Sequence, residues 1–240
     1  MNWTYLTWML PHGTSTFAPG ISRLYYVILI ITGIAFVIVE AGLIWFCIKY
    51  RSRPGQKAHY THGSATAEIT WTSITAVTVV VLGIMSAGLW NHIKGRNSVP
   101  PDAIAYGVKA KQFEWNVTYA GADGQLGTAD DFKIRNQLHV PVNKPILINL
   151  ESEDAIHSFF VPSFMLKQDA VPGMKIRVWF QATEAGQREL ACAELCGLGH
   201  YKMRAMVYVH PQQEYDQWLK DQIAEHAAQA GEPAPTVAQR

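Results

Sequence analysis

The most informative stretch of this 240-residue chain is Cys192-Ala-Glu-Leu-Cys196-Gly-Leu-Gly-His200-Tyr-Lys-Met203. It gathers two thiols, an imidazole and a thioether into one short segment. Sulfur ligands select Cu(I), imidazole suits copper, and a weak axial methionine is typical of electron-transfer copper sites. Two cysteines that face one point can bridge two copper ions, and the second ion then needs another imidazole. His157 is the best candidate for this imidazole. The motif lies on a loop between two predicted strands, residues 188–191 and 204–209, and a rigid β scaffold would hold such ligands in place.

Three other interpretations of the two cysteines were weighed. Haem c attachment needs C-x-x-C-H, whereas three residues separate Cys192 from Cys196 and a glycine follows the second cysteine. A structural zinc site usually has two paired ligand knuckles and no use for Met203. A disulfide between Cys192 and Cys196 is possible in an oxidising compartment, but it leaves the spacing of His200 and Met203 unexplained. Zinc and a disulfide remain open alternatives to copper.

Two long apolar segments precede the cysteine motif. Residues 24–48 carry Glu40 as their only formal charge, and residues 69–90 carry none. At about 1.5 Å per helical residue, each is long enough to cross a hydrocarbon core of about 30 Å. A buried core helix is the alternative, but Trp71 and Trp90 at the ends of the second segment favour a membrane span. The sequence therefore predicts a helical transmembrane hairpin over residues 24–94, preceded by an external segment, residues 1–23.

The loop between the two spans predicts the orientation of the hairpin. Residues 49–57 contain four basic residues and no acidic one, which places this loop on the cytoplasmic side and both termini outside. The net charge of +1 gives no argument for a nucleic-acid partner.

Short alternating segments separated by Pro, Gly, Asn and Asp follow, which is typical of an all-β domain over residues 95–225. The clearest predicted strands are residues 104–110, 113–119, 146–150, 175–180, 188–191 and 204–209. Residues 121–131 contain three carboxylates, yet a solvated hairpin tip is favoured over a calcium loop because a regular ligand alternation and a closing Glu are lacking. Residues 211–225 predict a helix, and residues 226–240 a flexible tail.

Together these motifs resemble one family, subunit II of haem-copper cytochrome c oxidases. The resemblance rests on the hairpin, on Asp154-Ala-Ile-His157-Ser158-Phe159, on Lys167-Gln-Asp169-Ala-Val-Pro172-Gly173 and on the cysteine motif. It implies a two-helix transmembrane hairpin followed by an all-β cupredoxin-like Greek-key barrel that holds two copper ions, the CuA centre. The implied copper ligands are His157, Cys192, the backbone carbonyl of Glu194, Cys196, His200 and Met203.

The resemblance also assigns a pairing to these ligands. It implies that Cys192 and Cys196 bridge the two ions, that His157 and Met203 complete one of them, and that His200 and Glu194 complete the other.

The resemblance gives further residues a role. The side chain of Glu194 is implied to bind Mg or Mn at the interface with subunit I, and Asp169 is implied to belong to the same interface without binding the metal. Glu68 matches a carboxylate at the mouth of a proton pathway, although an acid at a helix start is also a common dipole partner. Phe113 stands where the family commonly has the tryptophan that receives electrons, and Trp115 is predicted to flank the copper from the same strand, with ordinary core packing as the alternative.

The implied function is electron uptake for a terminal oxidase. A c-type cytochrome, soluble or membrane-tethered, would reduce the copper centre, and haem in subunit I would then receive the electrons, reduce O2 to water and drive proton translocation. None of the nine histidines lies in either span, so subunit I must supply the haems. Subunit III is a further implied partner, and the implied location is the bacterial inner membrane with the copper domain on the periplasmic or outer side, in preference to the mitochondrial inner membrane.

Two functions of other classes are weighed beside this one. A quinol oxidase subunit II would have lost copper ligands, whereas all six positions are filled here. A membrane-anchored copper chaperone would need neither a rigid two-copper core nor Glu68.

Overall fold

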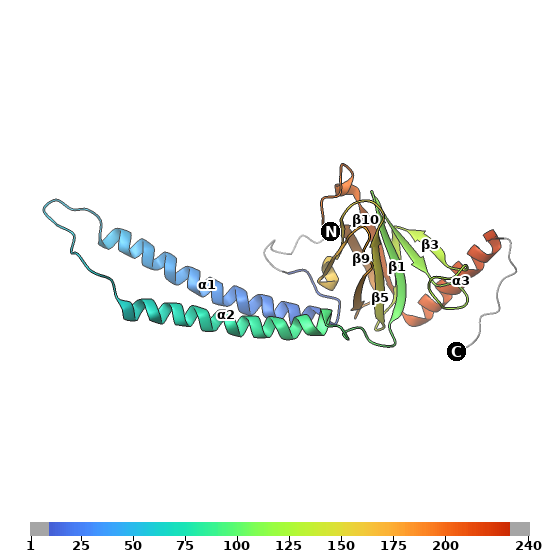
Figure 1. Ribbon diagram of the computed structural model, residues 1–240, viewed down its shortest axis with the longest axis horizontal. Helices are drawn as coiled ribbons and strands as arrows, with labels where there is room; N and C mark the ends of the chain where they lie inside the picture. Colours follow the sequence, from blue (N-terminus) through green and yellow to red (C-terminus); the bar gives the residue numbers. More distant parts are fainter. Residues whose placement is uncertain (1–9, 231–240) are drawn as a thin grey trace. The chain divides into compact units, whose positions relative to one another are not determined.

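The computed structural model describes residues 10–230, and residues 1–9 and 231–240 lie outside the described part (Figure 1). The chain divides into a helical unit, Gly20–His92, and a second unit that contains the β domain. The division falls close to the predicted boundary at residue 95.

Two long helices form the first unit. α1 spans Ala18–Lys49 and α2 spans Ala65–Lys94, so both begin before the predicted spans. Pro19 suits the first turn of α1 because its missing N–H would have no partner there. The hydroxyl of Ser64 caps α2 by accepting a hydrogen bond from the N–H of Ala67 at 3.3 Å.

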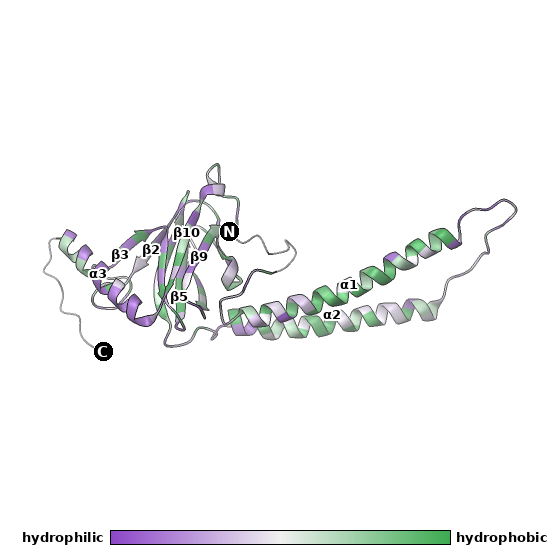
Figure 2. Ribbon diagram, turned by 180° about the vertical axis from the view of Figure 1, so that it is seen from behind, coloured by the Kyte–Doolittle hydropathy of each residue, from purple (hydrophilic) through white to green (hydrophobic). Residues whose placement is uncertain are grey.

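The surface of these helices is suited to a lipid environment. The most apolar stretch of each helix has none of its residues buried, and Figure 2 shows hydrophobic residues along α1. Hydroxyl groups of the helices donate to the carbonyl one turn earlier, as Thr70 does to Thr66 at 2.7 Å and Ser86 to Leu82 at 2.8 Å. Such internal hydrogen bonds satisfy polar groups where water is absent.

The β domain consists of two five-stranded sheets. Its strands are β1 (Ile104–Lys111), β2 (Glu114–Tyr119), β3 (Phe132–Arg135), β4 (Gln137–Pro141), β5 (Pro145–Ser152), β6 (His157–Val161), β7 (Leu166–Ala170), β8 (Ile176–Gln181), β9 (Gly186–Cys192) and β10 (Arg204–His210). One sheet has the order β3-β2-β1-β5-β8 and the other β4-β10-β9-β6-β7. The pairs β1–β5 and β4–β10 are parallel and the rest antiparallel. Because β4, β6, β7, β9 and β10 lie in one sheet and the other strands in the second, the chain crosses repeatedly between the sheets, as in a Greek key.

Apolar side chains from both sheets fill the space between them. The fully buried members include Trp115, Leu138, Ile146, Ile148, Leu150, Phe159, Phe180 and Leu190. Alternation along β1, β2 and β5 places every second residue in this core, which is why these strands were visible in the sequence.

Four strands were absent from the clearest predictions: β3, β4, β6 and β7. β3 and β7 are short, and β4 and β6 are buried on consecutive positions, so none of them shows a clear alternation. The predicted strand over residues 113–119 begins one residue later, because Gln112 and Phe113 form the turn between β1 and β2. Residues 121–131 form the hairpin tip between β2 and β3, where backbone N–H groups donate to Asp130 and Asp131.

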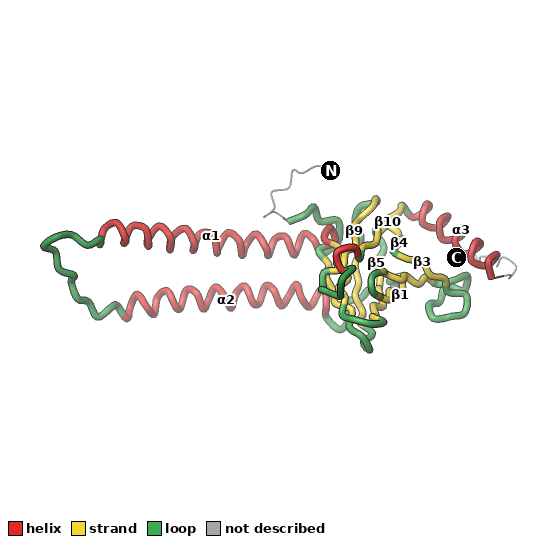
Figure 3. Tube along the Cα trace, turned by 90° about the horizontal axis from the view of Figure 1, so that it is seen from above, coloured by secondary structure: helices red, strands yellow, loops and turns green. Residues whose placement is uncertain are grey.

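The helix after β10, α3, spans Gln212–Ala230. The prediction of a flexible tail from residue 226 is therefore wrong for residues 226–230, and the rest of that tail lies outside the described residues (Figure 3). The hydroxyls of Tyr215 and Tyr106 are 2.6 Å apart in the protein interior, and the Trp218 ring packs edge-on against Tyr119. Within the extension, the His226 ring stacks on Phe132 with 4.9 Å between ring centroids, and this contact holds the later turns of the helix against the barrel.

The described residues before α1 pack against the β domain. Ser15 forms a β-bridge with Ala182 and donates a hydrogen bond from its hydroxyl to the carbonyl of Phe164 at 2.7 Å. Phe17 is buried and packs edge-on against Trp179 at 4.6 Å between ring centroids.

Candidate metal centre

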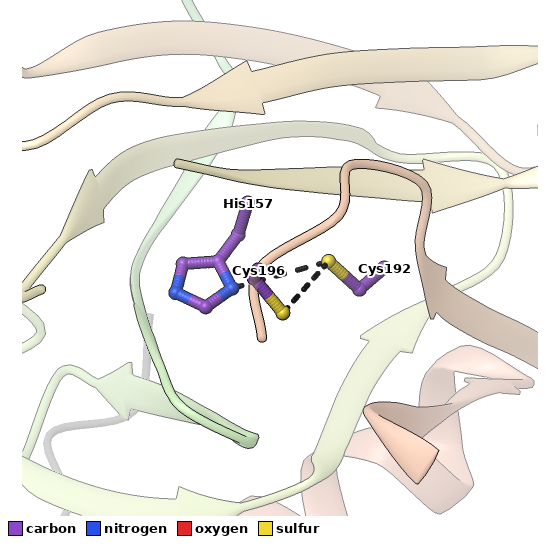
Figure 4. A group of neighbouring side chains, drawn as sticks. All are labelled: His157, Cys192 and Cys196. Atoms are coloured by element: carbon purple, nitrogen blue, oxygen red, sulfur yellow. Dashed lines mark hydrogen bonds between the residues drawn. The ribbon is translucent and has the colours of Figure 1, made fainter. Parts of the chain in front are cut away.

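Two neighbouring strands bring the predicted ligands together. Cys192 ends β9, and His157 begins β6, which pairs antiparallel with β9 through Phe159 opposite Cys192. Cys196 lies in the loop that follows β9. Figure 4 shows the three side chains converging on one point.

The distances among these three residues fit shared metal ligands. Their ligand atoms all lie within 4.8 Å of one another, and all three residues are buried. The Sγ atoms of Cys192 and Cys196 are 3.9 Å apart, and the Sγ of Cys192 is 3.9 Å from Nδ1 of His157. A disulfide would hold the sulfurs at about 2.05 Å, so both thiols are free in this structure.

Three further donors surround the cysteines. A short 3-10 helix, η2 (His200–Lys202), places Nδ1 of His200 3.6 Å from Sγ of Cys196. Met203 follows it, is 1% exposed, and lies with its Sδ 3.8 Å from the same sulfur. The carbonyl oxygen of Glu194 is 3.2 Å from Sγ of Cys192.

This donor set fits copper. Metal–sulfur bonds are about 2.3 Å and metal–nitrogen bonds about 2.0 Å. A sulfur and a nitrogen bound to the same ion therefore lie at most about 4.3 Å apart. Each histidine satisfies that limit with a cysteine, at 3.9 Å for His157 and 3.6 Å for His200. Two thiols, two imidazoles and a thioether suit copper better than a closed zinc site, which has no use for a thioether.

Burial keeps the Cys196 thiol protonated when no metal is bound. Removal from water, followed by the neighbouring Cys192, raises the pKa of the Cys196 thiol to about 11. A cationic metal offsets that cost by binding the thiolate, so metal uptake at this loop releases protons.

A carboxylate orients His157 from outside the site. Oδ1 of Asp154 is 2.8 Å from Nε2 of His157, which leaves Nδ1 of the imidazole directed at the sulfurs. Partial burial opposes ionisation of Asp154, but hydrogen bonds from His157 and from the N–H groups of Gln112 and Ala155 outweigh it and lower the pKa of this carboxyl group.

Phe113 and Trp115 both lie at the site, but not as two residues of one strand. Phe113 is in the β1–β2 turn, is 36% exposed, and places its ring against the backbone of Gly197 and Gly199. Trp115, in β2, is completely buried, with its ring 6.3 Å from that of His157 between centroids. Among the described residues, the indole N–H of Trp115 has no hydrogen-bond partner.

The remaining predicted residues lie outside this cluster. The side chain of Glu194 is exposed, although its carbonyl faces the sulfurs. Asp169 accepts hydrogen bonds from Ser158 at 2.7 Å and Lys167 at 2.8 Å. Glu68 is in the first turn of α2, in the other unit of the chain.

Sequence reasoning missed one contributor to the site, Gln112. Its side-chain amide donates to the carbonyl oxygen of Cys196, and its backbone N–H donates to Asp154 at 2.7 Å. Nothing in the sequence pattern signals these contacts, because they join segments distant along the chain.

The fold and the site define a membrane-anchored, cupredoxin-like protein with a sulfur-rich metal centre. Residues 110–209 match the family described as "Cytochrome C oxidase subunit II, periplasmic domain", and residues 2–89 match its "transmembrane domain". The chain belongs to the cytochrome c oxidase subunit II family, and it is accordingly a membrane protein and a subunit of a haem-copper terminal oxidase complex.

Individual relatives agree with this assignment. The chain is 32% identical over 80% of its length to the alternative cytochrome c oxidase subunit 2 of Bradyrhizobium diazoefficiens, covering 76% of that protein. It is 29% identical over 90% of its length to cytochrome c oxidase subunit 2 of Thermostichus vulcanus, covering 79% of that protein. A crystal structure of the periplasmic domain of subunit II of cytochrome oxidase of Bradyrhizobium japonicum matches 51% of this chain and 95% of that domain, with 28% identity and a TM-score of 0.46.

Proposed function

We propose that this subunit holds a binuclear copper centre that takes up electrons one at a time from a c-type cytochrome and passes them to haem in subunit I. There O2 is reduced to water with proton translocation. The observation that carries the proposal is the convergence of two free, buried thiols with His157, while His200, Met203 and a backbone carbonyl surround the same sulfurs.

The residues divide the task of holding the ions. Cys192 and Cys196 would bridge them, His157 with Met203 would complete one, and His200 with the carbonyl of Glu194 the other. A copper pair held by these residues would supply one-electron redox chemistry, with the electron shared between the two ions.

The chain's own residues hold the ligands in place and shield most of them from water. His157, Cys192, Cys196 and Met203 are all buried, which excludes water from the ligands. His157 and Cys192 lie on paired strands, so the ladder between β6 and β9 limits their movement.

The exposed Phe113 is the proposed point of electron uptake, with Trp115 behind it beside His157. The side chain of Glu194 would bind Mg or Mn at the contact with subunit I, and Glu68 would serve proton uptake. The four basic residues of the loop over residues 49–57 support a cytoplasmic loop and a copper domain on the periplasmic or outer side of a bacterial inner membrane. Subunit III is a further proposed partner.

Electron paramagnetic resonance of the copper-loaded full chain in detergent, together with a metal count, tests the central proposal. We expect two coppers per chain and one unpaired electron whose hyperfine splitting is spread equally over both nuclei. A Cys196→Ser chain should lose this signal. One localised copper in the unmodified chain, or zinc retained in preference to copper, would contradict the proposal.

A further inference from the structure

A two-residue turn, Gln112 and Phe113, reaches the metal centre although neither residue is a candidate ligand. It joins β1 to β2, where Lys111 pairs with Glu114. The turn contacts both chain segments that carry the ligands, the loop after β9 and the segment before β6.

Gln112 contacts the two segments with different groups. Its side-chain amide donates to the carbonyl oxygen of Cys196, in the loop after β9. Its backbone N–H donates to Oδ2 of Asp154 at 2.7 Å, in the segment before β6.

Asp154 carries the second contact on to a ligand. Its other oxygen, Oδ1, is 2.8 Å from Nε2 of His157 and accepts from the N–H of Ala155 at 2.6 Å. Both carboxylate oxygens are therefore engaged, one by the turn and one by the imidazole. Gln112 therefore hydrogen-bonds directly to Cys196 and is connected to His157 through Asp154.

Phe113 packs onto the same loop that Gln112 holds. A Cβ at Gly199 would clash with the ring of Phe113, and a Cβ at Gly197 would lie 2.8 Å from Nε2 of Gln112. Gly197 also has φ +132°, a conformation that side chains disfavour. Only glycine at positions 197 and 199 allows the turn to lie this close to the loop after β9.

We propose that Gln112 is a positioning residue that fixes the cysteine loop and the His157 segment relative to one another and to Phe113. Replacing its side chain would leave every ligand in place along the chain and would keep the backbone N–H that donates to Asp154. It would free the Cys196 carbonyl and so break the link between the two segments. This inference rests on the proposed function and assigns it a residue outside the ligand set. Loss of contacts that orient ligands typically lowers metal affinity by about 10- to 100-fold.

The test uses two substitutions in the full chain in detergent. Gln112→Glu keeps the shape of the side chain, but a carboxylate cannot donate to the Cys196 carbonyl. Gln112→Ala removes the side chain altogether. Gln181→Ala is the matched control, because Gln181 also donates from its amide to a backbone carbonyl, that of Asn143 at 3.3 Å, away from the metal loop.

Three quantities are measured for each chain: copper affinity by competition with a chelator, the paramagnetic resonance spectrum, and the melting temperature without metal. We expect both Gln112 variants to lose about 10- to 100-fold in copper affinity and to share the electron unequally between the two nuclei. Their metal-free melting temperatures should match the unmodified chain, because Gln112 is exposed. Gln181→Ala should change neither the affinity nor the spectrum.

Two results would overturn the inference and leave the proposed function standing. The first is a Gln112 variant whose copper affinity stays within about twofold of the unmodified chain and whose spectrum is identical. The second is a Gln112 variant whose melting temperature without metal falls enough to account for its weaker copper binding. An unmodified chain that binds no copper pair would instead overturn the proposed function.

Discussion

At the scale of single residues, the metal centre separates donors that hold an ion from side chains that surround it. The two cysteines, His157 and Met203 are buried, whereas Phe113 keeps about a third of its surface in solvent. Replacements at buried and exposed positions should therefore affect different properties.

Met203→Leu should change the copper centre without unfolding the protein. Leucine has a similar volume, so the stability cost should remain below about 1.5 kcal/mol, but it removes the sulfur that lies 3.8 Å from Cys196. Because a weak axial donor stabilises the oxidised state, we expect a higher reduction potential, measured by spectroelectrochemistry. An unchanged potential would show that Met203 is not a ligand.

Phe113→Leu should slow electron uptake and leave the copper spectrum intact. The ring is exposed and stacks on the metal loop, so its loss removes the proposed contact with the donor. A tenfold slower reduction by a c-type cytochrome corresponds to about 1.4 kcal/mol in the barrier and is readily detected by stopped flow. Glu153→Gln, a change at a nearby exposed acid, provides the control, and equal rates for Phe113→Leu and the unmodified chain would exclude this role.

At the scale of elements, α3 is bound to the barrel by a stack of aromatic rings and histidines. The His139 ring lies 4.1 Å from Trp218 of α3 and 4.5 Å from Tyr208 of β10, nearly parallel to both. Its Nδ1 is 2.9 Å from Nε2 of His210. Burial, followed by the proximity of His210, lowers the pKa of His139 to about 4.

Stability should therefore fall in mildly acidic solution. The unfolded chain binds a proton at His139 near pH 6.5, whereas the folded chain does so only near pH 4, so stability is lost as the pH falls through this window. We expect a loss on the order of 2 kcal/mol, measured by denaturant unfolding of the β domain signal at several pH values. Burial also lowers the pKa of His210, so its titration adds to the same trend.

His139→Phe is the matched variant, because phenylalanine preserves the stack but cannot bind a proton. Its stability should vary less between pH 6.5 and pH 4.5 than that of the unmodified chain. Identical pH dependence in the two chains would contradict this assignment.

At the scale of the whole molecule, several acidic side chains of the β domain are paired with basic side chains of the same domain. Glu114 lies 3.3 Å from Arg135, Glu153 3.2 Å from Lys111, and Glu151 3.3 Å from Lys175. Residues 95–240 contain 14 basic and 17 acidic residues, a net charge of −3, because the four basic residues of the loop over residues 49–57 lie outside this domain. These ion pairs leave the β domain with only a small excess of negative charge, so its attraction of a basic partner from a distance should be weak.

Electron uptake should accordingly depend only weakly on ionic strength. Between about 20 and 200 mM salt we expect the second-order rate of reduction by a cytochrome to change by less than about threefold, because steering that salt would screen is small. Stopped-flow measurements across this range check the expectation. A steep decline with salt would show that the acidic side chains act together despite their basic partners.

The sequence alone determined the ligand types, the two apolar spans and the β class of the remaining domain, because these follow from local composition and periodicity. The cysteine loop with His200 and Met203 was recognisable because its donors are neighbours along the chain. His157 was the best candidate for the second imidazole and was implied by the resemblance, and the pairing of β6 with β9 brings it to the thiols.

Only the tertiary structure decided which side chains support that site. The turn at Gln112, the close approach that needs Gly199, and the docking of α3 through His139 all join residues distant in sequence. A pattern of hydrophobicity or spacing carries no signal for such contacts, because each depends on where separate strands meet. The strands β3, β4, β6 and β7 were not predicted for a related reason. They are short or buried at consecutive positions, so they show no alternation, and neighbouring strands specify their pairing.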